Sequence, residues 1–264
     1  MPSYNSGGFI ERSIRSVLNQ DWPETELIIM DGGSNDGTVA VLERYADRLA
    51  YWESAPDKGQ SDALNKGFAR ATGDVYGWLN ADDLYLPGAF VHVAAAFADA
   101  QTKLAYGDWL SIDSDDAELF RHIALPPSLP RLVADGFQFN LQATFWRATL
   151  HELAGPFDLS LHRTMDFDFA VGLLQAARRS EITVLEEPLG AFRRHPAQKT
   201  QGFDERVAAE QRAIAVKRGI GWKYTWRVLP VRLQAKAVKA LVWLRRGAWH
   251  EFARFAARTP YTDS

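Results

Sequence analysis

The chain has 264 residues, of which 47% are hydrophobic and 24% charged, and its formal net charge is −3. These values are ordinary for a soluble globular protein with a substantial core, and they exclude collagen, a coiled coil and a disordered chain. No apolar run approaches the roughly 18 to 20 residues that span a bilayer, so we expect neither a transmembrane helix nor a signal peptide. The lack of cysteine excludes disulfides and thiolate catalysis, and it favours a reducing, cytoplasmic location.

Helical and strand patterns alternate along the first part of the chain, which is typical of an α/β protein. Apolar residues recur with helical spacing over 8–20, and Asn5 or Ser6 is available to cap this helix. Residues 27–30 form a predicted strand that ends at Asp31, and the turn residues GGSNDGT lead from it into a further helix. Asp31 is thereby placed at the carboxyl end of a strand, where open α/β sheets bind ligands.

The same order of elements repeats further along the chain. A helical stripe through Leu64 and Phe68 ends at Gly73, and a strand over 75–79 runs directly into the residues NADD. The remaining expected elements are a helix over 88–98, a strand over 104–109, a loop over 113–130, a strand over 144–146, a helix over 167–177, and strands over 182–185 and 189–193.

The start of the chain has an unusual pattern. Pro2 to Asn5 resemble the loop that leaves a first strand, yet no strand pattern precedes them. We therefore expect the natural start to lie several residues upstream. Loss of a central strand would leave backbone groups and apolar neighbours unpaired, so we also expect reduced stability.

Acidic residues follow two of the predicted strands. Asp31 and the pair Asp82 and Asp83 are expected to face one crevice at the carboxyl edge of the sheet. Adjacent carboxylates repel each other unless a cation compensates, and hard divalent cations bind carboxylates and phosphates together. A metal-bound diphosphate is the predicted ligand, and the alternative is that Asp82 and Asp83 belong to a helix cap.

Six sequence blocks occur here in a characteristic order: PSYN, SIRSVLNQ, IMDGGSNDGT, DKGQSDALNKG, ATGDVYGWLNADD and MDFDF. In these blocks, over about residues 1–200, the chain resembles glycosyltransferase family 2. The resemblance implies the GT-A fold, an α/β fold with a mixed sheet flanked by helices. It also implies a nucleotide-diphosphate sugar as donor, Mn²⁺ or Mg²⁺ as cofactor, and inversion at the anomeric carbon.

The resemblance assigns a nucleotide site to residues from three blocks. They are Pro2, Ser3, Tyr4, Asp31, Asp57, Asn65 and Lys66. In the family pattern Asp31 matches the acid that contacts the base or ribose, and Lys66 is a phosphate contact. For Asn65 an amide on the helix surface is the alternative.

The metal site is assigned by the same resemblance to Asp82, Asp83 and His195. Asp82 matches the last carboxylate of the Asp-x-Asp motif of the family, whereas Asn80 replaces the first. Asp82 is therefore the principal expected ligand for Mn²⁺ or Mg²⁺, with Asp83 as a helper. His195 matches a position near the metal or diphosphate.

Asp166 matches the second acid of the family's Glu-Asp motif and is the expected catalytic base, although Met165 replaces the first acid. Apolar neighbours such as Met165 and Phe167 would desolvate its carboxylate and raise its pKa towards the working pH. The alternative is a first-turn acid favoured by the helix dipole, and Asp168 is expected to be such an acid.

An acceptor pocket is assigned by the resemblance to Gln142 and Trp146, because aromatic faces suit sugar rings. A place in the core is the alternative for Trp146. The chain lacks the Gln-x-x-Arg-Trp motif of processive synthases, so one sugar is expected to be added per encounter.

Residues 217–258 contain eleven Lys or Arg and one acid. From Val231 onward apolar and basic residues alternate as in amphipathic helices that lie on an anionic membrane surface, and a lipid-linked acceptor would explain this. The alternative is a helical hairpin packed on the acidic body. Nucleic acid is not expected, because no binding motif accompanies the charge. We divide the chain into a GT-A domain over 1–218 and a basic helical tail over 219–264.

The sequence therefore predicts an inverting glycosyltransferase that acts in cell-surface polysaccharide or glycolipid assembly. Its expected partners are a nucleotide-diphosphate sugar and a saccharide or lipid-linked saccharide. Its expected location is the cytoplasm, with peripheral attachment to the inner face of the cell membrane. The alternative is a catalytically impaired relative that binds sugar, nucleotide or a partner protein, because Asn80 and Met165 stand where the family has acids.

Overall fold

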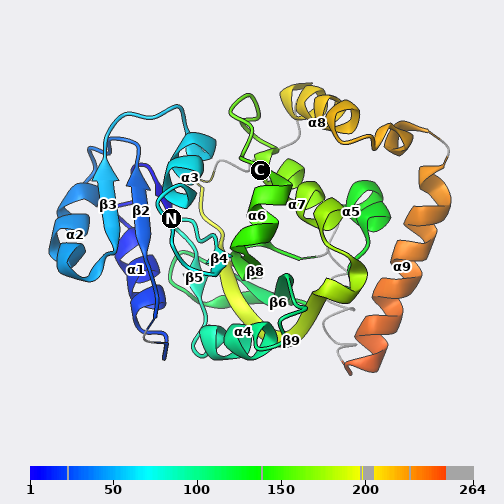
Figure 1. The fold of residues 1–264 in the computed structure, drawn as a ribbon, viewed down its shortest axis with the longest axis horizontal. Coiled ribbons are helices and arrows are strands. Elements are labelled where there is room, and N and C mark those ends of the chain that lie inside the picture. Colours follow the sequence, from blue (N-terminus) through cyan, green and yellow to red (C-terminus); the bar gives the residue numbers. More distant parts are fainter. Residues whose placement is uncertain (23, 138, 197, 199–204, 226, 248–264) are drawn as a thin grey trace.

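The computed structural model describes residues 1–247, except 23, 138, 197, 199–204 and 226 (Figure 1). The end of the predicted tail, residues 248–264, lies outside the described residues. The helices and strands, in chain order, are β1 (Pro2–Ser3), α1 (Ile10–Leu18), β2 (Ile28–Asp31), α2 (Thr38–Tyr45), β3 (Tyr51–Ser54), α3 (Gln60–Phe68), β4 (Val75–Gly77), β5 (Leu84–Tyr85), α4 (Ala89–Phe97), β6 (Leu104–Ile112), β7 (Glu118–His122), α5 (Leu129–Asp135), β8 (Thr144–Arg147), α6 (Ala148–Ala154), α7 (Met165–Ala176), β9 (Ile182–Arg193), α8 (Glu205–Lys217) and α9 (Val228–Arg245).

The strands form two sheets. Strands β1, β2 and β3 are parallel, in the order β1-β2-β3, and Ser3 lies opposite Asp31. The second sheet has the order β4-β8-β6-β9-β5, with β7 paired to β6. Strands β6 and β9 run parallel, whereas β8 and β7 run antiparallel to β6. Helices pack around both sheets (Figure 1), which confirms the predicted mixed α/β class.

Helix α1 shows how the apolar pattern of the sequence becomes a packed helix. Ile10, Ile14 and Val17 are buried on one face, as their helical spacing predicts. The prediction that Asn5 or Ser6 caps the helix is wrong, because the first turn has no side-chain cap. The carbonyl of Ser6, not its hydroxyl, accepts the first amide hydrogens, and the side chain of Asn5 accepts one from the next loop.

The start of the chain is a strand rather than the expected loop. Pro2 and Ser3 form β1, which pairs with Met30 and Asp31 of β2. Two residues supply few ladder hydrogen bonds, so the expected loss of stability stays a prediction.

A cleft of about 720 Å³ lies between β2 and β4, away from the carboxyl end of β2. Its walls include Leu27 and Ile28 on one side, Val75 and Tyr76 on the other, and Gly67 of α3. The cleft therefore lies between the amino-terminal end of β2 and strand β4, whose strand partner among the described residues is β8.

Two segments differ from the expected elements. The predicted loop over 113–130 contains strand β7 and the start of α5, and the two predicted strands after Ile182 are one strand, β9. Glu186, Glu187 and Pro188 interrupt the apolar pattern of β9, and the pairing of β9 with β6 shifts register beside them. Such an irregularity accommodates a proline, which lacks an amide hydrogen, so the strand continues where the pattern suggests a break.

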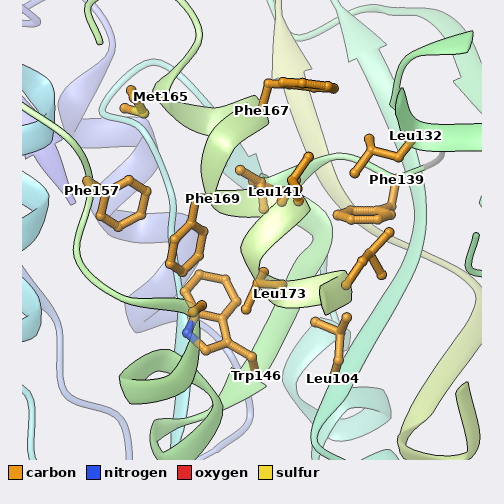
Figure 2. Packing of buried hydrophobic residues seen from close by; sticks show 14 of the residues in the cluster. Leu104, Leu132, Phe139, Leu141, Trp146, Phe157, Met165, Phe167, Phe169 and Leu173 are labelled. Carbon is orange, nitrogen blue, oxygen red and sulfur yellow. The ribbon is translucent and has the colours of Figure 1, made fainter. Parts of the chain in front are cut away.

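The main core surrounds α7 (Figure 2). Trp146 of β8 is fully buried there and packs edge-on against Phe169 of α7, and Phe157 stacks on Phe169. The indole of Trp146 donates a 3.3 Å hydrogen bond to Nδ1 of His151. Burial lowers the pKa of His151 to about 4, so its imidazole is neutral at pH 7 and can accept this bond.

The described part of the tail packs on the body. Helix α9 lies along α5 (Figure 1) and buries Val228, Ala235 and Trp243. At its end Arg246 donates two hydrogen bonds of 2.8 and 3.0 Å to the buried carboxylate of Asp108 in β6. This favours the packed alternative for the tail. Among the described residues no helix combines the length and apolarity needed to cross a bilayer.

Gly67 offers a test of packing beside the cleft. A methyl group there would lie 3.5 Å from Cγ of Met30 and 3.9 Å from Cγ2 of Ile28, which are ordinary contacts. Glycine inside a helix is destabilising by about 0.5–1 kcal/mol relative to alanine. We expect Gly67→Ala to raise the free energy of unfolding by about 1 kcal/mol in urea denaturation.

Gly37 supplies the control for this measurement. It precedes α2 with φ of +97°, so alanine there is strained although the space around it is open. Gly37→Ala should lower the free energy of unfolding. An equal gain from both variants would contradict the claim that backbone conformation and local space at each glycine decide the effect.

Candidate active site

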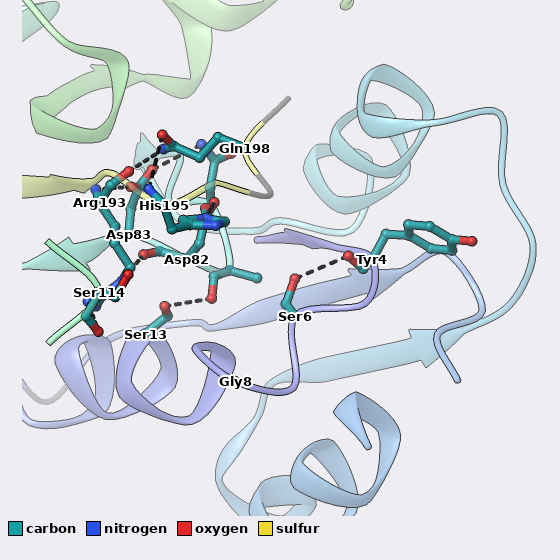
Figure 3. A network of polar contacts seen from close by, with 12 residues as sticks. Tyr4, Ser6, Gly8, Ser13, Asp82, Asp83, Ser114, Arg193, His195 and Gln198 are labelled. Carbon is teal, nitrogen blue, oxygen red and sulfur yellow. Dashed lines mark hydrogen bonds and ion pairs between the residues drawn. The ribbon is translucent and has the colours of Figure 1, made fainter. Parts of the chain in front are cut away.

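Loops that follow β2, β3 and β4 meet at one edge of the protein. A methyl group on Gly32, after β2, would lie 3.2 Å from Oδ2 of Asp57, after β3. Gln60, which starts α3, donates a 2.9 Å hydrogen bond to Oδ1 of Asn80, after β4. In Figure 3 Ser13 of α1 joins the same loop through the carbonyl of Ala81, at 2.8 Å. The predicted site stretches around Asp31, Asp57 and Asp82 are thus neighbours.

Asp31 is 3% exposed and holds the loop that follows β2. Its carboxylate accepts hydrogen bonds from the amide and hydroxyl of Ser34, from the amide of Gly33 and from the hydroxyl of Ser54. These bonds fix the backbone of the loop that follows β2. Ser3 lies opposite Asp31 across β1 and β2, and its buried hydroxyl has no hydrogen-bond partner among the described residues.

Tyr4 and Asp57 lie at the same edge. Tyr4 is 66% exposed, and its ring points away from Asp82 (Figure 3). Oδ1 of Asp57 accepts the amide hydrogen of Gly59, at 2.7 Å, and shapes the turn ahead of α3.

The side chains of Asn65 and Lys66 both bind other residues of the protein. The amide group of Asn65 donates to the carbonyl of Phe157 and accepts from its amide, both at 2.8 Å. Asn65 is therefore not a free surface amide, and it ties α3 to the segment ahead of α7. Lys66 forms a 2.9 Å ion pair with Asp62 one turn away, and this hydrogen bond raises the pKa of Lys66.

Asp82 and His195 come together as predicted, from segments far apart in the sequence (Figure 3). Oδ2 of Asp82 lies 3.0 Å from Nε2 of His195, and the side chain of Asp82 is 29% exposed. The imidazole packs on Phe9, with ring centroids 4.6 Å apart. Its Nδ1 atom is buried and has no hydrogen-bond partner among the described residues.

Arg193 at the end of β9 positions this pair. Its side chain is fully buried, and Nε donates a 2.7 Å hydrogen bond to the carbonyl of Asp82. Its Nη1 atom forms an ion pair with Asp116 and donates to the carbonyl of Asp113 at 3.0 Å. The guanidinium thereby connects the loop of Asp82 to the loop between β6 and β7.

Asp83 is not part of the surface beside Asp82, which corrects the prediction that it helps to hold a metal. It is 0% exposed and accepts hydrogen bonds from the amide of Arg193 and from Nδ2 of Asn80, at 2.9 and 3.0 Å. Burial, and then the charge of Asp82, raises the pKa of Asp83 well above its usual range. Asn80 also accepts a hydrogen bond from the indole of Trp78. Asn80 and Asp83 therefore stabilise the loop after β4.

The described residues contain no group of three His, Asp or Glu side chains gathered as a metal site. They do supply the partly exposed Asp82 and the imidazole of His195 at one point. Mg²⁺-type sites often use one or two carboxylates, with substrate phosphates completing the coordination. The donor set therefore fits an ion that arrives with a diphosphate.

Asp166 lies in the first turn of α7, half-buried between the buried side chains of Met165 and Phe167. Its Oδ1 atom accepts the amide hydrogen of Phe167 at 2.7 Å. These apolar neighbours are those that the sequence predicts. Because Asn65 joins α3 to Phe157, the segment that leads to Asp166 is fixed to the helix that begins at the site.

Helix α8 holds the start of α7 through two acids, one on each helix. Glu210 accepts the amide hydrogens of His162, Arg163 and Thr164 at 2.9–3.0 Å. Asp168, predicted as a cap-like acid, is 1% exposed and pairs with Lys217 and Arg218 at 2.9 and 2.7 Å.

Sequence reasoning missed Glu210, although its position carried a signal. Glu210 lies three residues after Val207 and four before Ile214, on the buried face of α8. A carboxylate on such a face requires partners, and here the partners are the amides ahead of α7.

Gln142 and Trp146 do not form a surface pocket together. Trp146 is 0% exposed in the core, so the prediction that it contacts an acceptor sugar is wrong, and the alternative of a core residue is confirmed. Gln142 lies in a short turn, Leu141–Ala143, at 7% exposure, and its acceptor role stays a prediction.

Together the fold and the site define a class of protein. A parallel β1-β2-β3 unit carries the loops at one edge, and it is followed by a mixed sheet with an acid-bearing loop after β4. This is the GT-A arrangement, which confirms the predicted fold. The sequence pattern of Glycosyl transferase family 2 matches residues 1–155, and the chain belongs to that family.

Relatives in sequence agree with this assignment. The chain is 27% identical to an uncharacterized protein of Mycobacterium tuberculosis over 265 residues, which covers 92% of this chain and 79% of that protein. It is 32% identical to an uncharacterized glycosyltransferase of the same species over 178 residues, which covers 66% of each. The match thus spans about two thirds of that glycosyltransferase.

Solved structures share the fold. S. aureus TarS 1–349 in complex with UDP-GlcNAc superposes with a TM-score of 0.64 at 20% identity, covering 82% of this chain and 64% of that one. The mannosyltransferase PcManGT from Pyrobaculum calidifontis, in complex with GDP-Man and Mn²⁺, gives a TM-score of 0.59 at 17% identity. It covers 98% of this chain and 80% of that one.

Glu210 provides a test of how α8 supports the site. Burial alone would raise the pKa of Glu210, but hydrogen bonds from the amides of His162 and Arg163 and from Thr164 lower it below its usual value. The carboxylate therefore stabilises the fold above the pKa it has in the unfolded chain, about 4.3, and this contribution is lost as the pH falls through the lower folded pKa.

We expect Glu210→Gln to lower the free energy of unfolding at pH 7 by about 2 kcal/mol, because two hydrogen-bonded oxygens become one. In urea titrations the difference from the unsubstituted protein should shrink below about pH 4.3. Glu205→Gln, an exposed change on the same helix, is the control. A difference that stays constant from pH 7 to 3 would argue against the charged contact.

Proposed function

We propose that this protein transfers one sugar from a nucleotide-diphosphate sugar to an acceptor hydroxyl, with inversion at the anomeric carbon. The observation that carries the proposal is the meeting of the loops after β2, β3 and β4 beside the pair of Asp82 and His195. Family membership supports it. So does the likeness in fold to proteins solved with UDP-GlcNAc and with GDP-Man.

The nucleotide is proposed to lie over β1 and the loop that Asp31 organises. Pro2, Ser3 and Tyr4 border it, with the exposed ring of Tyr4 as one wall. Asp57 lies beneath it. The buried hydroxyl of Ser3 offers one hydrogen-bonding group that the described residues leave for a ligand.

Asp82 and His195 would hold Mn²⁺ or Mg²⁺ together with the diphosphate. When bound, such an ion neutralises the charge that develops on the leaving diphosphate. The chain itself contributes a fixed carboxylate, since Arg193 binds the backbone of Asp82 from inside the protein. The Mn²⁺ in the PcManGT complex supports this assignment.

Asp166 is proposed as the base that accepts the proton of the acceptor hydroxyl. The oxygen of the acceptor forms a bond to the anomeric carbon while the bond from that carbon to the diphosphate oxygen breaks. A single displacement of this kind inverts the configuration. The buried side chains of Met165 and Phe167 flank this carboxylate in the sequence, and its Oδ1 atom accepts the amide hydrogen of Phe167.

The acceptor is proposed to be a saccharide or lipid-linked saccharide in cell-surface polysaccharide or glycolipid assembly, with Gln142 beside it. A lipid-linked acceptor implies a cytoplasmic protein attached peripherally to the inner face of the cell membrane. The division into a domain over 1–218 and a tail over 219–264 belongs to the same proposal, and Gly219, with φ of +65°, ends α8 at this point.

The second candidate is a family relative without turnover that binds sugar, nucleotide or a partner protein. The contacts of Asn80 favour it, because its side chain hydrogen-bonds to Gln60 of α3, to Trp78 and to Asp83. An assay of transfer and donor hydrolysis with Mn²⁺ separates the two candidates.

Asp166→Asn tests the proposed base. Asparagine keeps the shape but accepts no proton, so transfer should fall by about 10²–10⁴-fold, while the thermal shift given by the donor stays unchanged. Loss of donor binding together with transfer would instead indicate a structural role for Asp166.

Asp82→Asn tests the proposed ion site. The stabilisation that a nucleotide-diphosphate sugar gives in thermal unfolding should depend on Mn²⁺ in the unsubstituted protein and lose that dependence in the variant. Asp74→Asn, an exposed change ahead of β4, is the control and should keep it. An unchanged Mn²⁺ effect in Asp82→Asn would remove Asp82 from the site.

A further inference from the structure

Helix α9 has two apolar faces, and the described part of the protein buries one of them. Val228, Ala235 and Trp243 are buried against the body. The other face is exposed to solvent along the whole helix. Its large apolar side chains, with their exposed fractions, are Leu229 at 59%, Leu233 at 69%, Leu241 at 64% and Leu244 at 49%.

The four leucines form one stripe. At 100° per residue their directions fall within about 120° of the helix circumference, the width of the apolar face of an amphipathic helix. Scattered exposed leucines are normal, but a continuous apolar stripe on a surface helix marks an interaction site.

Basic side chains border the stripe on both sides. Lys236 lies along one edge, and Arg227 and Arg245 lie along the other, all of them exposed. Arg232, next to Lys236, instead donates a 2.9 Å hydrogen bond from Nε to the carbonyl of Ala134 in α5. The sequence of α9 contains no acid. Arg246, which follows the helix, is instead turned inward onto Asp108 and fixes the helix on the body.

We propose that this outer face of α9 lies in the interface of an anionic bilayer, with the leucines among the acyl chains and the basic groups near the lipid headgroups. Leucine together with Lys and Arg is the pattern of helices that lie on membranes. A second copy of the chain suits this face poorly, since pairing would place the same basic rows against each other.

In one respect this membrane surface rests on the proposed function, because a lipid-linked acceptor would give membrane attachment a purpose. Lipid binding itself requires no catalysis. The two ideas can therefore fail separately.

Co-sedimentation of the full chain with vesicles tests the proposal. We expect at least tenfold stronger binding to vesicles of phosphatidylglycerol and phosphatidylethanolamine than to phosphatidylcholine vesicles, and partial weakening by salt. The double variant Leu233→Gln and Leu241→Gln should lower binding at least tenfold, with an unchanged melting temperature. Val216→Gln, on α8 at 85% exposure, is the matched control and should bind normally.

Equal binding by the double variant, or no preference for anionic vesicles, would overturn the proposal. Sedimentation velocity adds a further outcome against it: a dimer that the leucine changes dissociate would identify a second copy as the occupant. Donor-induced thermal shifts without vesicles report on the proposed function alone. Their absence beside intact vesicle binding would count against transfer and not against the membrane surface.

Discussion

The buried guanidinium of Arg193 is the interaction on which the geometry of the site depends. A charge enclosed in protein is costly unless it is paired and hydrogen-bonded. Nε and Nη1 of Arg193 are satisfied by Asp116 and by the carbonyls of Asp82 and Asp113, whereas Nη2 has no partner among the described residues. Its own amide binds Asp83. One residue at the end of β9 thereby fixes the loop after β4 and places Asp82 and His195 side by side.

The second half of the site depends on a different set of charges. The family pattern matches residues 1–155, yet the proposed base lies beyond it, on α7, and α7 is held by α8. Glu210 binds the amides ahead of α7, and Asp168 binds Lys217 and Arg218. The region after the matched segment thus supports the position of Asp166.

Much of the fold follows from periodicity. The strand that ends at Asp31, the apolar face of α1 and the mixed α/β class follow from short-range patterns, because burial of one face dictates them. Strand β7 and the continuity of β9 through residues 186–188 do not follow from such patterns. Both depend on pairing with β6, a partner that no local window of sequence contains.

In the candidate site, too, some features follow from the sequence pattern and others depend on tertiary contacts. Motif order singles out Asp82 and His195 and ranks Asp82 above Asp83, but it does not predict that the side chain of Asp83 is buried. Trp146 and Asn65 are further cases, since core packing and a backbone contact with Phe157 decide their roles. Side-chain direction is set by tertiary contacts, and residue type does not determine it.

A crystal structure with a nucleotide-diphosphate sugar and Mn²⁺ would show whether the loops after β2, β3 and β4 form the donor site. We expect the nucleotide over β1 and the Asp31 loop, the diphosphate beside Asp82, and the anomeric carbon on the side of Asp166. A nucleotide bound in the cleft between β2 and β4, or a diphosphate remote from Asp82, would contradict this arrangement.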